Sequence, residues 1–106
     1  MNFKALASNL DFDEEDFKEL VELFIETSFS DLEKINFGLE ENNATSIAQA
    51  AHSIKGASGS LGFQPIATMA QDIEMRAKEG NINDLEEIIN SITEELKKIE
   101  YAIKEN

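Results

Sequence analysis

The chain contains no cysteine, no tryptophan, one proline and one histidine. The absence of cysteine excludes disulfides, thiolate metal sites and cysteine nucleophiles. It favours a reducing compartment, because small secreted domains commonly depend on disulfides. No apolar run approaches the roughly 20 residues that span a bilayer, and the acidic residues from Asp11 onward argue against a cleaved signal peptide. We therefore expect a cytoplasmic protein without membrane insertion.

Positive charge is also scarce, since the chain has nine Lys and Arg but 22 Asp and Glu, and its net charge is −13. Nucleic-acid binding depends on clustered basic residues, so we expect no nucleic-acid partner. The acidic residues are unevenly placed, because none lies between Asn42 and Gln71. Two explanations stand side by side: an acidic or anionic partner approaches this segment, or the segment is a buried central helix.

The low proline and glycine content permits long helices, and no segment alternates polar and apolar residues with period two. Apolar spacing predicts helices over residues 3–9, 13–41, 44–61, 65–79 and 82–103. The last helix has an apolar seam with alternating spacings of three and four, typical of antiparallel bundles. Its members are Ile82, Leu85, Ile89, Ile92, Leu96, Ile99 and Ile103. The predicted fold class is all-α: one domain, residues 1–106, forming an antiparallel four-helix bundle with a short additional N-terminal helix.

The start of the second predicted helix is acidic over residues 13–16. Asp13 is a typical N-cap residue, and Phe12 and Phe17 stand at the two positions of a hydrophobic staple. We interpret the acidic run as negative charge at the positive end of a helix dipole. A metal site there is the less favoured alternative, and we expect no metal.

The third predicted helix holds the only histidine, His52. At about 100° per residue, Ile47, Ile54 and Leu61 lie on its far side and predict the core face. Thr45, Ala48, Gln49, Lys55, Gly56 and Gly59 lie nearer to His52, which is therefore expected to be exposed. Each glycine inside a helix costs about 1 kcal/mol relative to alanine. The two glycines predict a bare surface that a macromolecular partner can approach, with close helix packing as the alternative.

A single exposed imidazole restricts the chemistry. Without a second histidine or a cysteine, metal binding is unfavourable, and the same helix supplies no carboxylate that would complete a hydrolytic triad. A neutral imidazole is a competent nucleophile near neutral pH. Lys55, about one helical turn after His52, is placed to neutralise an anion on the ring. The pattern favours attack on a phosphoryl group whose metal ion is supplied by the partner.

Residues 52–62, HSIKGASGSLG, resemble the signature of histidine phosphotransfer (HPt) domains of two-component phosphorelays. The resemblance implies that Nε2 of His52 accepts a phosphoryl group from a receiver-domain aspartate and passes it to another receiver. Lys55 would then stabilise the phosphohistidine. The surface around His52 on the same helix predicts partner docking at Thr45, Ala48, Gln49, Gly56 and Gly59. Gln71 and Glu74 lie where the family often places polar residues facing the histidine.

The implied partners are response-regulator receiver domains and a sensor or hybrid histidine kinase. The chain would need no cofactor of its own, and Mg²⁺ would reside in the receiver. No glycine-rich nucleotide box is present, so we expect neither ATP hydrolysis nor self-phosphorylation. Two alternatives remain open. One is the phosphoacceptor domain of a chemotaxis-type kinase, which shares the motif. The other is a non-catalytic acidic helical adaptor that docks proteins through the small-residue surface around Ala48 and exposed apolar residues of the second helix.

Overall fold

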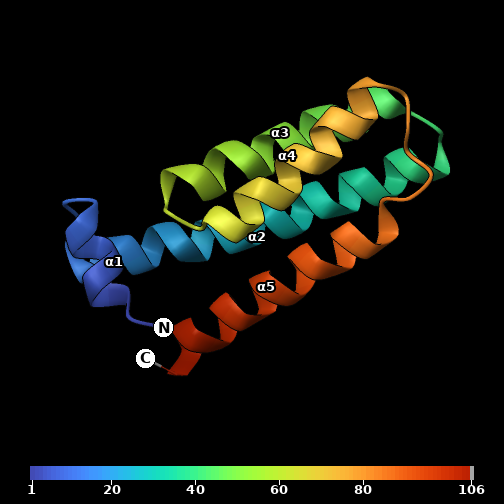
Figure 1. The fold of residues 1–106 in the computed structure, drawn as a ribbon. Coiled ribbons are helices and arrows are strands. Elements are labelled where there is room, and N and C mark those ends of the chain that lie inside the picture. Colours follow the sequence, from blue (N-terminus) through green and yellow to red (C-terminus); the bar gives the residue numbers. More distant parts are fainter. Residues whose placement is uncertain (106) are drawn as a thin grey trace.

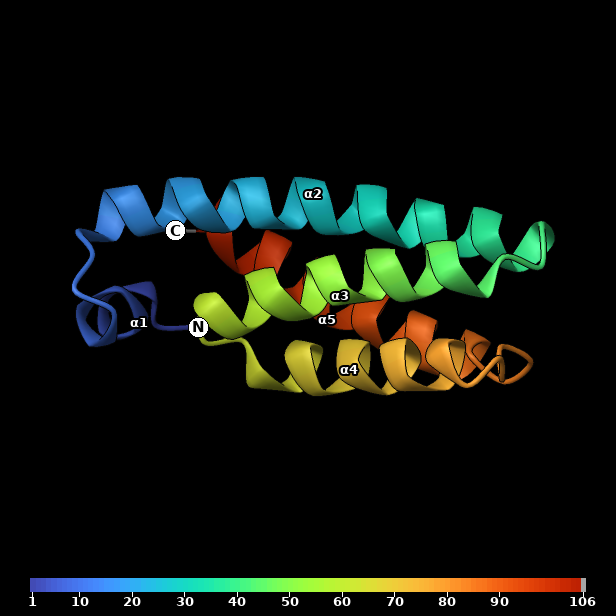
Figure 2. The same cartoon turned by 90° about the horizontal axis from the view of Figure 1, so that it is seen from above.

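The computed structural model describes residues 1–105, which form five helices and no strand. The helices are α1 (Phe3–Asn9), α2 (Glu14–Glu40), α3 (Ala44–Ser60), α4 (Gln64–Lys78) and α5 (Glu86–Glu105). Helices α2 to α5 run antiparallel as a bundle, and α1 lies at the end where α2 begins (Figures 1 and 2). The predicted all-helical bundle with a short N-terminal helix is confirmed. No helix within residues 1–105 has the length and apolar character needed to cross a membrane.

The helix starts follow local rules that are readable in the sequence. The Asp13 carboxylate accepts a hydrogen bond from the Glu15 backbone N–H at 3.2 Å and caps α2. The Phe12 and Phe17 ring centroids lie 6.3 Å apart, as a hydrophobic staple requires. The acidic first turn of α2 therefore follows a capped helix N-terminus, where negative charge is favourable.

The core is formed by apolar side chains from all five helices. Helix α3 lies between α2 and α4 and packs against both (Figure 2). Gly38 allows a close approach of α2 to α3, because a Cβ there would lie 2.7 Å from Cγ1 of Ile47. Among the largest fully buried side chains are Phe3, Phe17, Ile35, Ile47, Ile54, Ile66, Ile73, Leu85, Ile92 and Leu96. This arrangement buries one side of α3 and leaves a strip of it open.

The predicted start of the last helix is wrong. The helix was expected from residue 82, but α5 begins at Glu86. Gly80 has a φ of +78° just after α4 ends, and Asn83 and Asp84 are residues whose short polar side chains favour turns over helix. Ile82 and Leu85 are nevertheless buried. Two members of the apolar seam therefore reach the core from the connecting segment and not from the helix.

Candidate functional site

The open strip of α3 presents His52 to solvent. Its side chain is 65% exposed, whereas Ile47 and Ile54 on the opposite side of the helix are fully buried. The other exposed residues of α3 are Thr45, Gln49, Ser53, Gly56, Gly59 and Ser60. The strip is defined by these residues together with His52, and it contains no acidic residue.

Two kinds of small residue border His52, and they differ in environment. A Cβ added at Gly56 or Gly59 would meet no atom within 4 Å, so helix packing does not require these glycines. Ala48 was expected on the exposed surface, but it is only 8% exposed and belongs to the hydrophobic core. The reason is its position on the flank of α3 that faces α4, which packs closely against it. The close-packing alternative therefore fails for the glycines and holds for Ala48.

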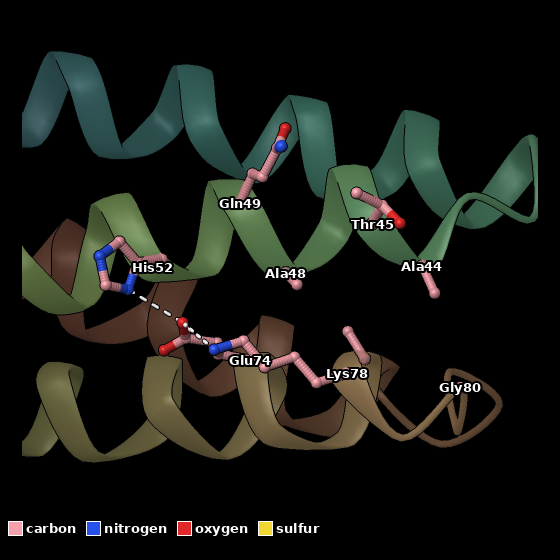
Figure 3. A pocket seen from close by; sticks show the side chains of 9 residues that line it. Ala44, Thr45, Ala48, Gln49, His52, Glu74, Lys78 and Gly80 are labelled. Atoms are coloured by element: carbon pink, nitrogen blue, oxygen red, sulfur yellow. Dashed lines mark hydrogen bonds and ion pairs between the residues drawn. The ribbon is translucent and has the colours of Figure 1, made fainter.

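A carboxylate from α4 contacts the histidine. The side chain of Glu74 is 5% exposed, and its Oε2 lies 2.9 Å from Nδ1 of His52. Lys55 places Nζ 2.7 Å from Oε1, and Lys78 places Nζ 3.2 Å from Oε2. Figure 3 shows His52 and Lys78 converging on Glu74 from the two helices. The carboxylate that α3 itself lacks is thus supplied by the neighbouring helix.

These contacts fix the charge of Glu74. The hydrogen bond from Lys55 has the largest effect, and with those from Lys78 and His52 it outweighs the opposing effect of burial. Together they lower the pKa of Glu74 from 4.5 to about 2. The side chain is therefore an ionised carboxylate at neutral pH and accepts hydrogen bonds only.

The ionised carboxylate also decides which nitrogen of a neutral His52 ring carries the proton. Because Glu74 has no hydrogen to donate, the hydrogen in the 2.9 Å contact belongs to Nδ1. Nε2 then has a free lone pair, and Figure 3 shows this nitrogen pointing away from Glu74. The arrangement exposes a nucleophilic nitrogen while its partner nitrogen is held.

The remaining residues predicted at the site are less closely connected to the ring. Lys55 is half-buried, with 33% of its side chain exposed, and it reaches the site through Glu74. Gln71 lies exposed on α4, and within residues 1–105 the His52 ring donates its hydrogen bond to Glu74. Thr45 and Gln49 lie on the strip, toward the N-terminal end of α3.

Sequence reasoning missed two groups near His52. One is Lys78, which stands four residues after Glu74 on α4, a spacing that already favours an ion pair in the sequence. The other is on the α2 side, where Ser53 Oγ donates a hydrogen bond of 2.7 Å to Asp31. Asp31 is 5% exposed and lies 3.8 Å from Nζ of Lys34. No spacing in the sequence indicates this contact, since it joins residues 22 positions apart.

A groove lies between α3 and α4 beside the histidine (Figure 3). It has a volume of about 750 Å³. Its lining residues are Ala44, Thr45, Ala48, Gln49, His52, Glu74, Ala77, Lys78 and Gly80. His52 and Glu74 therefore form part of the wall of a hollow that continues along α3 toward its N-terminus.

Comparison with known proteins identifies the family and the fold. No curated protein matches the chain significantly. The crystal structure of histidine-containing phosphotransfer protein B (HptB) from Pseudomonas aeruginosa PAO1 is similar, with a TM-score of 0.85 and 23% sequence identity. The match covers 99% of this chain and 91% of that one, so the two share a fold. The family model described as the Hpt domain matches residues 19–102. This match spans most of the sequence, and the chain therefore belongs to the Hpt domain family.

Proposed function

We propose that His52 is the phosphoacceptor of this histidine phosphotransfer module, accepting a phosphoryl group from a receiver-domain aspartate and passing it to another receiver. One observation carries the proposal: Nδ1 of His52 is held at 2.9 Å by an ionised, buried Glu74 while the ring remains largely exposed. This combination supplies a fixed tautomer and an accessible Nε2. In an exposed histidine without the carboxylate, no contact would determine which ring nitrogen carries the proton.

The transfer step uses the Nε2 lone pair, which forms the new N–P bond. The P–O bond to the donor aspartate breaks, and its electron pair leaves with the donor carboxylate. The ring then carries a positive charge, with Nδ1–H still directed at Glu74. The negative charge of Glu74 offsets the cationic ring, so we expect it to stabilise the transition state and the phosphohistidine. The reverse step delivers the phosphoryl group to the next receiver.

Lys55 has a supporting role in this proposal. It lies on α3 one turn after His52 and is partly open to solvent. Its ammonium group is placed to offset negative charge on a phosphoryl group bound to the ring. The larger electrostatic clamp would come from the receiver and its Mg²⁺, because the chain has no nucleotide box or metal-binding cluster among residues 1–105.

The partner surface proposed here is the exposed strip of α3. Gly56 and Gly59 leave room around the imidazole for a receiver. Thr45 and Gln49 are exposed on the same strip, and Ala48 lies at its buried edge. The strip lacks acidic residues in a protein of net charge −13. The receiver partners of this family have acidic active sites. The absence of carboxylates from the strip therefore removes charge repulsion where the two proteins meet. A sensor or hybrid histidine kinase would act upstream.

Incubation with phosphorylated receiver domains and Mg²⁺ tests the proposal. The expected product is a phosphoprotein whose label is lost in acid and kept in base. His52→Gln should abolish labelling and leave the helical circular dichroism and thermal unfolding unchanged, because the side chain is exposed and outside the core. Since His52 is the sole histidine, no second site of this type can replace it. Labelling retained in the variant would overturn the assignment.

A further inference from the structure

The groove between α3 and α4 extends well beyond the space that a phosphoryl group on His52 needs. It runs from His52 and Glu74 past Ala48 to Gly80, just after the end of α4 (Figure 3), and Ala77 also lines it. Its volume of about 750 Å³ is in the range of pockets that bind a whole small molecule or several side chains of a partner. A proton and a phosphoryl group do not account for a hollow of this length.

Alanines account for the depth of the groove. Ala48 on α3 and Ala77 on α4 are 8% and 3% exposed and form its floor. Ala44 closes the same wall nearer to the start of α3. Longer apolar side chains at these positions would fill the space between the two helices. The groove thus has an apolar floor that water covers in the free protein.

The polar end of the groove carries positive charge. Glu74 is the one acidic side chain in the lining, and it accepts bonds from both Lys55 and Lys78. Lys55 lies outside the lining, so Lys78 is the one basic side chain of the groove when His52 is neutral, and the Glu74 carboxylate is shared between the two ammonium groups. The Lys78 side chain is 67% exposed, so its ammonium group is open to a second carboxylate. Because Lys55 also neutralises Glu74, the Lys78 ammonium group keeps positive charge that is available to a partner, in a protein of net charge −13.

We propose that this groove is a docking slot for the receiver partner, in which Lys78 pairs with a partner carboxylate while an apolar side chain of the same segment lies over Ala48 and Ala77. The inference rests on the proposed function and adds the partner chemistry and one residue, Lys78. A second copy of the chain is a poor occupant, because two molecules of net charge −13 repel each other. The charge at the groove instead complements an acidic segment.

The slot also gives Lys78 a role that is distinct from that of Lys55. Lys55 contacts Oε1 of Glu74, whereas Lys78 contacts Oε2 from the groove side. If Lys78 is neutralised, Lys55 and the His52 ring still hold the carboxylate. We therefore expect loss of Lys78 to weaken docking more than it weakens the nucleophile.

Nuclear magnetic resonance of the ¹⁵N-labelled full chain tests the location of the slot. The probe is an unlabelled receiver domain chosen because it phosphorylates the parent protein. Titration should shift the amide signals of Ala44, Ala77 and Gly80 in addition to those around His52. Shifts confined to α2 and α3, with Ala77 and Gly80 unchanged, would overturn the proposal.

Variants test the chemistry of the slot. Lys78→Met removes the charge, and Thr45→Trp places bulk at the groove wall. Lys98→Met is the matched control, because Lys98 pairs with Glu95 on α5 away from the groove. Two rates are compared for each protein: transfer from the phosphorylated receiver, and labelling of His52 by phosphoramidate, a small donor that needs no docking.

We expect Lys78→Met and Thr45→Trp to slow receiver transfer about fivefold more than they slow phosphoramidate labelling. Lys98→Met should keep both rates of the parent. Equal losses in both rates would show that Lys78 acts on the histidine and would overturn the slot. If both rates stayed equal to those of the parent, the proposed slot would also be overturned. Failure of the proposed function gives a different result, since the parent itself would then accept no phosphoryl group from any receiver.

Discussion

The exposed surfaces of α3 and α5 differ sharply in charge. The exposed strip of α3 has no carboxylate, whereas α5 carries Glu86, Glu87, Glu94 and Glu105 at exposed positions. A buried central helix would explain an acid-free sequence by burial alone. The exposed positions of α3 are acid-free too, so burial does not account for the gap between Asn42 and Gln71. The comparison favours a surface that an acidic partner approaches.

The acidic residue that contacts His52 supports the same contrast. Glu74 is buried and held by three positively charged or hydrogen-donating side chains. Carboxylates on α5 are placed differently: Glu95, for example, pairs with Lys98, which is 70% exposed. The carboxylate beside the histidine is thus buried and held by specific partners, while exposed carboxylates on α5 favour solubility.

The largest effect in this set is expected for Glu74→Gln. An amide cannot offset the cationic ring, and its NH₂ group is able to donate to Nδ1, which would move the ring proton to Nε2. We expect phosphoryl transfer to slow about tenfold or more. Single-turnover transfer and the ¹⁵N signals of the imidazole give the rate and the tautomer. Glu95→Gln on α5 is the control, and an unchanged rate with Nδ1 still protonated would contradict the role of Glu74.

The same variant gives a pH-dependent stability. Because the pKa of Glu74 is lowered from 4.5 to about 2, its stabilising effect is complete above pH 4.5 and is lost as the pH falls through about 2. We expect Glu74→Gln to reduce the free energy of unfolding by about 1–3 kcal/mol at neutral pH. The difference from the parent should narrow between pH 4.5 and 2 in urea titrations. A difference that is independent of pH would argue against an ionised, stabilising Glu74.

A smaller effect is expected for Lys55→Ala. The side chain is one-third exposed, and an interaction of this kind is worth about 1 kcal/mol or less. Transfer should slow several-fold, the yield of phospho-His52 should fall, and the difference should shrink with added salt. Lys97→Ala on the exposed surface of α5 is the matched change. Equal behaviour of the two variants at low salt would show that Lys55 is an ordinary surface lysine.

Charge addition compares the two surfaces directly. Gln49→Glu places a carboxylate on the strip of α3, and Asn90→Glu makes the same amide-to-acid change on α5. We expect Gln49→Glu to slow transfer about two- to threefold at low salt, since repulsion between exposed charges is weak. Asn90→Glu should leave transfer unchanged. Equal rates for both variants would mean that the acid-free strip has no functional importance.

The sequence predicts elements better than contacts between them. The apolar spacing of each helix identifies its buried side, which is why the exposed position of His52 follows from Ile47 and Ile54 alone. The contact between His52 and Glu74 joins residues 22 positions apart on two helices. It depends on how α4 is rotated against α3, which no single-helix pattern determines. Ala48 was misplaced for the same reason, because a neighbouring helix covers it.

The smallest functional effect is expected for the two glycines of the strip. Gly56→Ala or Gly59→Ala should raise the free energy of unfolding by about 0.4–1 kcal/mol, because alanine favours the helix and open space surrounds both positions. Transfer should stay within about twofold of the parent, since a methyl group adds little bulk; a larger side chain there should block the receiver.

Gly38→Ala is the control for a packed glycine. Its Cβ would lie 2.7 Å from Ile47, and we expect a loss of about 1–3 kcal/mol. Thermal and urea unfolding give the stabilities. If Gly59→Ala were destabilised like Gly38→Ala while transfer stayed intact, Gly59 would be a packing residue and the bare surface beside His52 would lose its explanation.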